Sequence, residues 1–314
     1  MNPSNAFPAS KGKRFPFGWQ SMAVLAATFV VMAAGSAFAQ AVPPRVMAFV
    51  GILPQAYFVQ RVGGDFVEVD VLVGPGMSVE TYEPTPRQIS RLSRANVYFR
   101  MGLPFEDRLV SKISKLFPGV KIVDMRAGLR LLTLDDTSAQ GGVAGHSSGA
   151  EVPDPHIWLD PKQVKIQAGT IRTALSAIDP AHERAYRANC DRFLKDLDVL
   201  DAKIARSLAP HRGSRIYVFH PAFGYFTHSY GLRQVPVEIE GKEPSPRQLS
   251  RLIDKARLDG VRVIFVQPQF SKKGARAIAL AIRGAVVEIN PLPRDYLSEM
   301  GAMAETIEKA LRDR

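Results

Sequence analysis

EPTPRQISRL at residues 83–92 recurs 160 residues later as EPSPRQLSRL at residues 243–252. Eight of the ten positions are identical, and the other two exchange Thr for Ser and Ile for Leu. Each copy predicts a helix start, in which Thr85 or Ser245 is the N-cap, the proline after it takes the first helical position, and the glutamine three residues on closes a capping box. Because a short-period solenoid needs three or more units, two copies so far apart predict two similar α/β lobes.

The rest of the chain supports parallel sheets. Apolar runs alternate with helical patterns of about 10–15 residues, which is typical of such sheets. The predicted strands are residues 46–52, 67–73, 96–99, 121–124, 215–219, 261–266 and 285–289. Between the lobes, residues 179–210 predict one long helix, because apolar side chains from Tyr186 to Leu208 recur at 3.6-residue spacing. The predicted fold is α/β, with two lobes joined by this helix.

Composition and charge exclude several kinds of protein. The chain has 314 residues, of which 46% are hydrophobic and 23% charged, and this suits two globular domains. The net charge of +11 could suit nucleic acid or an anionic membrane face. We find no run of five basic residues and no basic amphipathic helix, so we expect a solvated basic surface and no nucleic-acid partner. The single cysteine, Cys190, excludes an internal disulfide and a cysteine-based metal site, and its spacing predicts a buried side chain.

The N-terminus carries the pattern of an export signal. Lys11, Lys13 and Arg14 form a positive segment, and residues 22–34 form an apolar segment too short to span a membrane. The sequence Ala-Phe-Ala at residues 37–39 fits a cleavage site. We therefore predict that residues 1–39 are a cleaved signal peptide and that the mature protein is periplasmic. An uncleaved signal anchor is the alternative.

Two histidines and an acidic loop suggest where a ligand binds. Open α/β sheets bind ligands beyond the carboxyl ends of their strands, so the cleft between two lobes is the natural site. His156 and His220 each lie beside a proline at a break between elements, and Glu80 lies in an acidic loop. Neutral imidazole is a common ligand of zinc, manganese and iron. Together these residues predict a metal site, and the other four histidines (His146, His182, His211 and His228) receive no role in it.

Five stretches resemble the solute-binding receptors of zinc/manganese-type ABC importers. They are PGMSVETYEPTPRQ (75–88), DPHIWLDP (154–161), FHPAFGYF (219–226), VQPQFS (266–271) and NPLPRDY (290–296). The resemblance covers the whole mature chain. It implies two Rossmann-like lobes, at residues 40–178 and 211–314, bridged by a rigid helix at residues 179–210. It also implies a monomer with one metal ion in the cleft, two ligands from each lobe, and delivery of that ion to an ABC permease in the inner membrane.

The resemblance also implies which residues hold the metal. His156 and His220 match the second and third family ligands. Glu80 occupies the place of the first ligand, usually a histidine, and Asn290 that of the fourth, usually an aspartate. Gln267 occupies the place of a common glutamate. Because Glu80 adds one negative charge and Asn290 removes one, the charge of the ligand set is unchanged and we expect the metal site to persist. An amide oxygen is a weak ligand, so a water can take the fourth position.

Zinc is the expected cargo, because His220 matches the zinc-type pattern where manganese receptors usually carry a glutamate. Manganese, iron or a metal chelate are alternatives, since two usual ligands are replaced and oxygen donors favour harder metals. A metal-dependent hydrolase is a further alternative, because a His₂-carboxylate site with an open position suits catalytic zinc. The chain has no HExxH pair and no supported general base. We therefore predict a binding protein that performs no chemistry, with a surface loop at residues 138–150 that shapes access to the site.

Overall fold

The computed structural model describes residues 12, 45–133, 153–238 and 242–313. Residues 44–314 form one compact unit. The predicted loop at residues 138–150, with His146, and the predicted signal peptide apart from residue 12 lie outside the described residues. Within the described ranges, no helix combines the length and the apolar character needed to cross a membrane.

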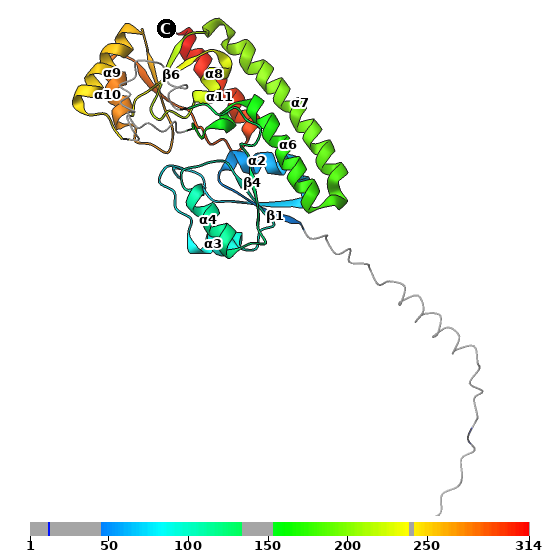
Figure 1. Cartoon of the computed structure of the whole chain (residues 1–314). Helices are drawn as coiled ribbons and strands as arrows, with labels where there is room; N and C mark the ends of the chain where they lie inside the picture. Colours follow the sequence, from blue (N-terminus) through cyan, green and yellow to red (C-terminus); the bar gives the residue numbers. More distant parts are fainter. Residues whose placement is uncertain (1–11, 13–44, 134–152, 239–241, 314) are drawn as a thin grey trace, which may run out of the picture. The chain divides into compact units, whose positions relative to one another are not determined.

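Two four-stranded parallel sheets form the framework (Figure 1). The first sheet has the order β2-β1-β3-β4 and the second the order β6-β5-β7-β8, so one topology occurs twice. The strands are β1 Val46–Val50, β2 Val67–Val71, β3 Val97–Arg100, β4 Lys121–Asp124, β5 Arg215–Val218, β6 Arg233–Pro236, β7 Val263–Val266 and β8 Ala285–Glu288. This repetition confirms the predicted α/β fold with two similar halves.

The repeated sequence opens equivalent helices, one before the third strand of each sheet. The helices are α2 Leu53–Gly63, α3 Pro86–Leu92, α4 Glu106–Leu116, α6 Pro161–Ile178, α7 Glu183–Leu208, α8 Gly224–Tyr230, α9 Pro246–Leu258, α10 Lys273–Ala281 and α11 Tyr296–Arg312. At α3 and α9 the N-cap N–H donates to the glutamine side-chain oxygen, over 3.0 Å at Thr85 and 2.8 Å at Ser245. The predicted capping boxes are therefore present in both copies.

One strand was not predicted from the sequence. Strand β6 has only four residues, RQVP, and forms an edge of the second sheet. A proline is tolerated on an edge strand because its missing N–H can face away from the sheet. The alternation of buried Val235 and Val237 was the available signal, but the flanking Arg233 and Pro236 obscured it.

The predicted long helix is α7, and its apolar stripe packs against several other helices. Seven of its predicted apolar positions are buried, and the eighth, Leu194, is partly buried. Phe193 lies against Phe58 of α2, with ring centroids 6.0 Å apart. Lys203 pairs with Glu305 of α11 at 2.7 Å. Cys190 is buried and free, as predicted. The boundaries of the two lobes at residues 178 and 211 remain predictions.

Helices cover both faces of the second sheet. Successive strand side chains point to opposite faces. On one face, Tyr217 and Ile264 pack with Leu252 of α9 and Ile278 of α10. On the other face, side chains such as Val218 pack with α8 and α11. The outward sides of α9 and α10 therefore form one surface of the molecule.

Candidate metal centre

Three of the four predicted ligands, Glu80, His156 and His220, converge on one point. Each offers one ligand atom, and these atoms all lie within 4.8 Å of one another. Glu80 lies in the loop after β2, His156 precedes the short helix η2 (Ile157–Leu159), and His220 follows β5. The two imidazoles are buried, whereas the Glu80 side chain is 35% exposed. The spacing suits two nitrogens and one oxygen around a single metal ion, with Glu80 as the most exposed of the three side chains.

The ring of His220 is held on three sides. Its Nδ1 lies 2.6 Å from Oε1 of the buried Glu238. Its face stacks on Phe270, with ring centroids 4.7 Å apart. Its Nε2 lies 3.4 Å from Oε1 of Glu80 but makes no hydrogen bond. A buried ring nitrogen that makes no hydrogen bond and points toward a carboxylate has the geometry of a metal ligand.

His156 is oriented in the same way. Its Nδ1 lies 2.7 Å from Oδ1 of the buried Asp154, and that oxygen also accepts the His156 backbone N–H at 2.9 Å. Metal-binding histidines typically donate the second ring N–H to a carboxylate, which fixes the tautomer and raises the basicity of the ligand nitrogen. Both imidazoles therefore present Nε2 to the centre.

The supporting carboxylates, Asp154 and Glu238, were missed as functional residues. Asp154 had a local signal, since it stands two residues before His156 in DPHIWLDP. Glu238 had none, because it lies 18 residues after His220 and reaches it only through the pairing of β5 with β6. Tertiary structure alone brings this carboxylate to the site.

Gln267 explains one departure from the family pattern. Its Oε1 accepts the His220 backbone N–H at 3.1 Å, and its Nε2 donates to the His220 carbonyl at 2.6 Å. The side chain is completely buried. An amide can accept and donate at once, whereas a glutamate would need a proton to do the same. Gln267 therefore positions the backbone of His220.

Asn290 is engaged in a turn after β8. Its Oδ1 accepts the Leu292 N–H at 3.0 Å, and its Nδ2 donates to the Leu292 carbonyl at 3.2 Å. The same oxygen accepts from Gln269 Nε2 at 3.4 Å. The predicted role of Asn290 as fourth ligand would require this oxygen to leave its partners.

The segment that carries His156 is tied to the second half of the molecule. Trp158 Nε1 donates to the Pro291 carbonyl at 2.7 Å, and Tyr296 donates its hydroxyl to the Trp158 carbonyl at 2.7 Å. These buried bonds fix the distance between the histidine of the first half and that of the second, whose rings lie 5.3 Å apart. A site that spans both halves is thereby preorganised.

The charges at the centre favour a protonated His220 in the absence of metal. Burial alone would lower the pKa of His220, but Glu238 and Glu80 outweigh it and raise the pKa to about 9. Burial would raise the pKa of Glu80, but the nearby histidines, His220 foremost, hold it below its ordinary value. Without metal, the His220 imidazolium thus lies between the side chains of Glu80 and Glu238.

The remaining described histidines lie in other surroundings. His182 stacks on Phe66 at 4.0 Å and pairs with Asp179 at 2.6 Å. His211 lies 3.7 Å from Glu308, and His228 is exposed on α8. A groove of about 490 Å³ along β4 and α6 is lined by none of the four predicted ligands.

Comparison with known proteins gives a consistent result. The sequence model of the periplasmic zinc-uptake complex component A, ZnuA, matches residues 49–310. A crystal structure of ZnuA is similar with a TM-score of 0.78 and 37% identity, over 85% of this chain and 99% of that one. The high-affinity zinc uptake protein ZnuA of Bacillus subtilis is 26% identical over 282 residues, 86% of this chain and 87% of that protein. The iron-binding protein YfeA of Yersinia pestis is 27% identical over 264 residues, 80% of this chain and 81% of that protein.

Proposed function

The chain belongs to the ZnuA family of periplasmic zinc-uptake components, and from this premise we propose that Glu80, His156 and His220 hold one zinc ion for delivery to an ABC permease. Members of the family are metal-binding components of zinc ABC uptake systems rather than enzymes. The observation that carries the proposal is the convergence of the three ligand atoms, with the buried Nε2 of His220 left without a hydrogen bond.

Zinc fits the donor set that the chain supplies. Two imidazole nitrogens and one carboxylate oxygen leave a fourth tetrahedral position for water, or for Asn290 if its turn opens. Iron is the second candidate, because two histidines and one carboxylate with open positions also suit Fe²⁺. The iron-binding relative YfeA supports this alternative. We also propose that the protein is exported to the periplasm and acts there as a monomer.

Metal titration tests the proposal directly. The chain from Gln40 onward, which contains the whole compact unit, would be stripped of metal and titrated with Zn²⁺, Mn²⁺ and Fe²⁺ while heat release and melting temperature are recorded. We expect one zinc per chain and stronger thermal protection by zinc than by the other ions. Greater protection by iron or manganese would reassign the cargo, and no binding at all would refute the metal site. Glu80→Ala should weaken zinc binding, whereas Glu83→Ala in the same loop should not.

Changing Glu238 to Gln is expected to lower zinc affinity about tenfold to 100-fold, although Glu238 touches no ligand atom that faces the metal. The neutral amide no longer raises the basicity of His220 and can turn its NH₂ toward Nδ1, which would select the wrong tautomer. Isothermal titration would measure the loss. The exposed Glu243→Gln is the matched control and should bind like the parent. An unchanged affinity in Glu238→Gln would show that this carboxylate does not support the ligand.

Zinc binding near pH 7.5 is expected to release close to one proton per ion, because His220 must lose its proton before Nε2 can ligate. The pKa of His220 is raised to about 9, so affinity should rise with pH up to that value and level off above it. In the metal-free protein, the stability of the fold depends on pH in the opposite direction. A raised histidine pKa stabilises the fold fully below about pH 6.5, the unfolded value, and this contribution is lost as pH rises through 9.

Titration in buffers that differ in ionisation enthalpy measures the proton count. The same experiment on His220→Ala should show that fewer protons are released per zinc ion. A parent protein that releases no proton at pH 7.5 would contradict the assigned charge state of His220.

A further inference from the structure

An excess of basic over acidic residues marks the segment that contains α9 and α10. Residues 245–284 contain nine basic and two acidic side chains, a net charge of +7, whereas the whole chain carries +11. Contrary to the sequence prediction, α9 is a basic amphipathic helix: Leu252 and Ala256 face the sheet, Arg247, Arg251 and Arg257 are exposed, and Lys255 is half-buried. The basic character of this segment was missed in the sequence, because the charges are spaced along two helices and never form a run.

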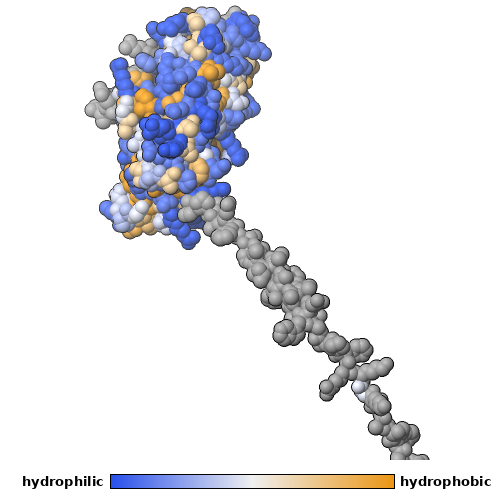
Figure 2. All heavy atoms as spheres, turned by 90° about the vertical axis from the view of Figure 1, so that its right-hand side faces the viewer, coloured by the Kyte–Doolittle hydropathy of each residue, from blue (hydrophilic) through white to orange (hydrophobic). Residues whose placement is uncertain are grey.

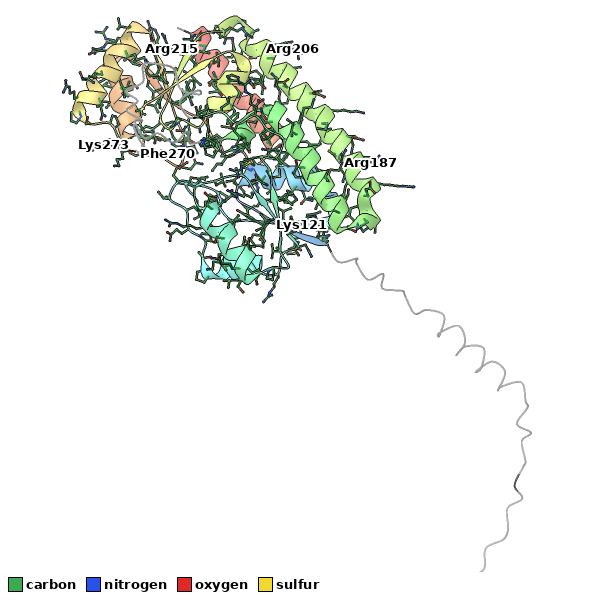
Figure 3. All side chains as sticks on the ribbon, viewed as in Figure 1. Lys121, Arg187, Arg206, Arg215, Phe270 and Lys273 are labelled. Atoms are coloured by element: carbon green, nitrogen blue, oxygen red, sulfur yellow. The ribbon has the colours of Figure 1, made fainter. Side chains whose placement is uncertain are left out.

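The outward sides of the two helices share one pattern. Arg247 and Arg251 on α9 and Lys273 and Arg276 on α10 are exposed. Among the ion pairs of the described residues, none involves these four side chains (Figure 3 labels Lys273). These four cations and the adjoining leucines of both helices are called the α9–α10 surface below.

Each helix carries a protruding leucine in its last turn. Leu258 of α9 is 88% exposed and Leu280 of α10 is 83% exposed, the two highest values among the large apolar side chains that the structure describes. The C-terminal ends of the helices lie together, since Arg257 of α9 donates to the Ala281 carbonyl of α10 at 3.0 Å. Two apolar side chains thus project from one end of a cationic surface.

Helix α7 shows that this pattern is not general. It has six basic and five acidic residues, and several of them pair, as Arg187 does with Glu183 at 3.1 Å. The side of the molecule on which α7 lies is mainly hydrophilic with scattered apolar residues (Figure 2). Balanced charge of this kind suits a solvated face, whereas the α9–α10 surface has excess positive charge without partners.

We propose that the α9–α10 surface docks on an anionic lipid surface, with Leu258 and Leu280 inserted among the headgroups. Each basic side chain near such a surface strengthens binding by about fivefold. Leucines that project into the headgroup region add apolar contact that water does not offer. The two features together match the chemistry of an anionic bilayer, which supplies diffuse negative charge and an apolar layer beneath it.

A bilayer fits better than an acidic protein. The cations are spread along two helices, and the leucines project from the surface at exposures above 80%, so nothing around them forms a socket for a partner side chain. The leucines lie where α9 and α10 lead into β7 and β8, whereas His220 follows the opposite, carboxyl end of its strand. Docking would therefore leave the metal centre open, and the inference does not depend on which metal binds there.

Vesicle sedimentation tests the proposal with the chain from Gln40 onward. We expect binding to vesicles rich in phosphatidylglycerol and none to pure phosphatidylcholine vesicles. Replacing Arg247, Arg251 and Arg276 by Gln should weaken binding about 100-fold, as three factors of about five predict. Leu258→Ser with Leu280→Ser should weaken it about tenfold. The matched control replaces Arg184, Lys195 and Arg206 of α7 by Gln, which removes the same charge, and should bind like the parent (Figure 3 labels Arg206).

Four results would overturn the proposal. The first is no sedimentation of the parent with anionic vesicles. The second is an equal loss in the α7 control, which would indicate net charge rather than this surface. The third is unchanged binding of the leucine variant, which would exclude insertion. The fourth is a parent protein that does not bind the vesicles but binds the permease in neutral lipid, while the arginine variant binds neither. That result would make the surface a protein-docking face. Melting temperatures and zinc titrations of all variants should match the parent, because every changed side chain is exposed.

Discussion

Replacing His220 by alanine is expected to reduce zinc affinity about 100-fold to several hundred-fold. Apparent binding free energies of about 10–16 kcal/mol for a four-ligand zinc site correspond to roughly 2.5–4 kcal/mol for each ligand, which is a factor of about 100 to several hundred in the dissociation constant. His220 is the ligand for which the structure gives most support, since Glu238, Phe270 and Gln267 all hold it in place.

The same substitution should also change the metal-free protein. His220 is the cation between Glu80 and Glu238, so its loss leaves the buried Glu238 without a charged partner. We expect a lower melting temperature near pH 7 and a smaller difference between the variant and the parent near pH 10, where the parent histidine is neutral as well. This pH dependence separates loss of a charged group from loss of packing.

The exposed His228→Ala in the same half of the molecule is the matched control. It should keep both the zinc affinity and the melting temperature of the parent. If His220→Ala bound zinc as tightly as the parent while His228→Ala did not, the assigned centre would be wrong. Competition with a zinc indicator of known affinity would resolve the expected difference.

Local chemistry made much of the fold predictable from sequence. Helix starts such as Thr85–Pro86 and the stripe of α7 depend on neighbours within one or two turns, so their signals survive in the sequence. Strand β6 was not predicted, because its four residues carry little strand signal of their own and are buried only by their place in the sheet. The excess charge of residues 245–284 can be counted in the sequence, but the sequence did not show that α9 and α10 lie on one face of a sheet and so present that charge on one surface.

The residues of the metal centre also differ in whether the sequence could predict them. His156 and His220 could be proposed because each lies beside a proline at a break between predicted elements. Glu238 could not be proposed, because its contact with His220 joins residues that only the β5–β6 pairing brings together. Gln267 was read as a departure from the family pattern, and its role in holding the His220 backbone became visible only in three dimensions.

Replacing Phe193 by alanine is expected to lower the free energy of unfolding by about 3–5 kcal/mol. Phe193 is completely buried on α7 and packs against α2, with Tyr57 and Phe58 at ring-centroid distances of 6.0 Å and the Arg61 guanidinium 5.0 Å from its ring. Because α7 also contacts α11, a cavity at this point weakens the helix that joins several parts of the core. Urea unfolding of the metal-free protein would measure the change.

Val199 lies on the same helix and is 69% exposed, so Val199→Ala is the matched control and should change stability by less than about 0.5 kcal/mol. The zinc affinity of folded Phe193→Ala should equal that of the parent, since Phe193 touches neither the ligands nor their supporting carboxylates among the contacts of the described residues. A loss of affinity without a loss of stability would mean that α7 acts on the metal centre itself. A loss of stability alone would show that the helix maintains the core while the hydrogen bonds of Trp158 and Tyr296 set the distance between the two histidines.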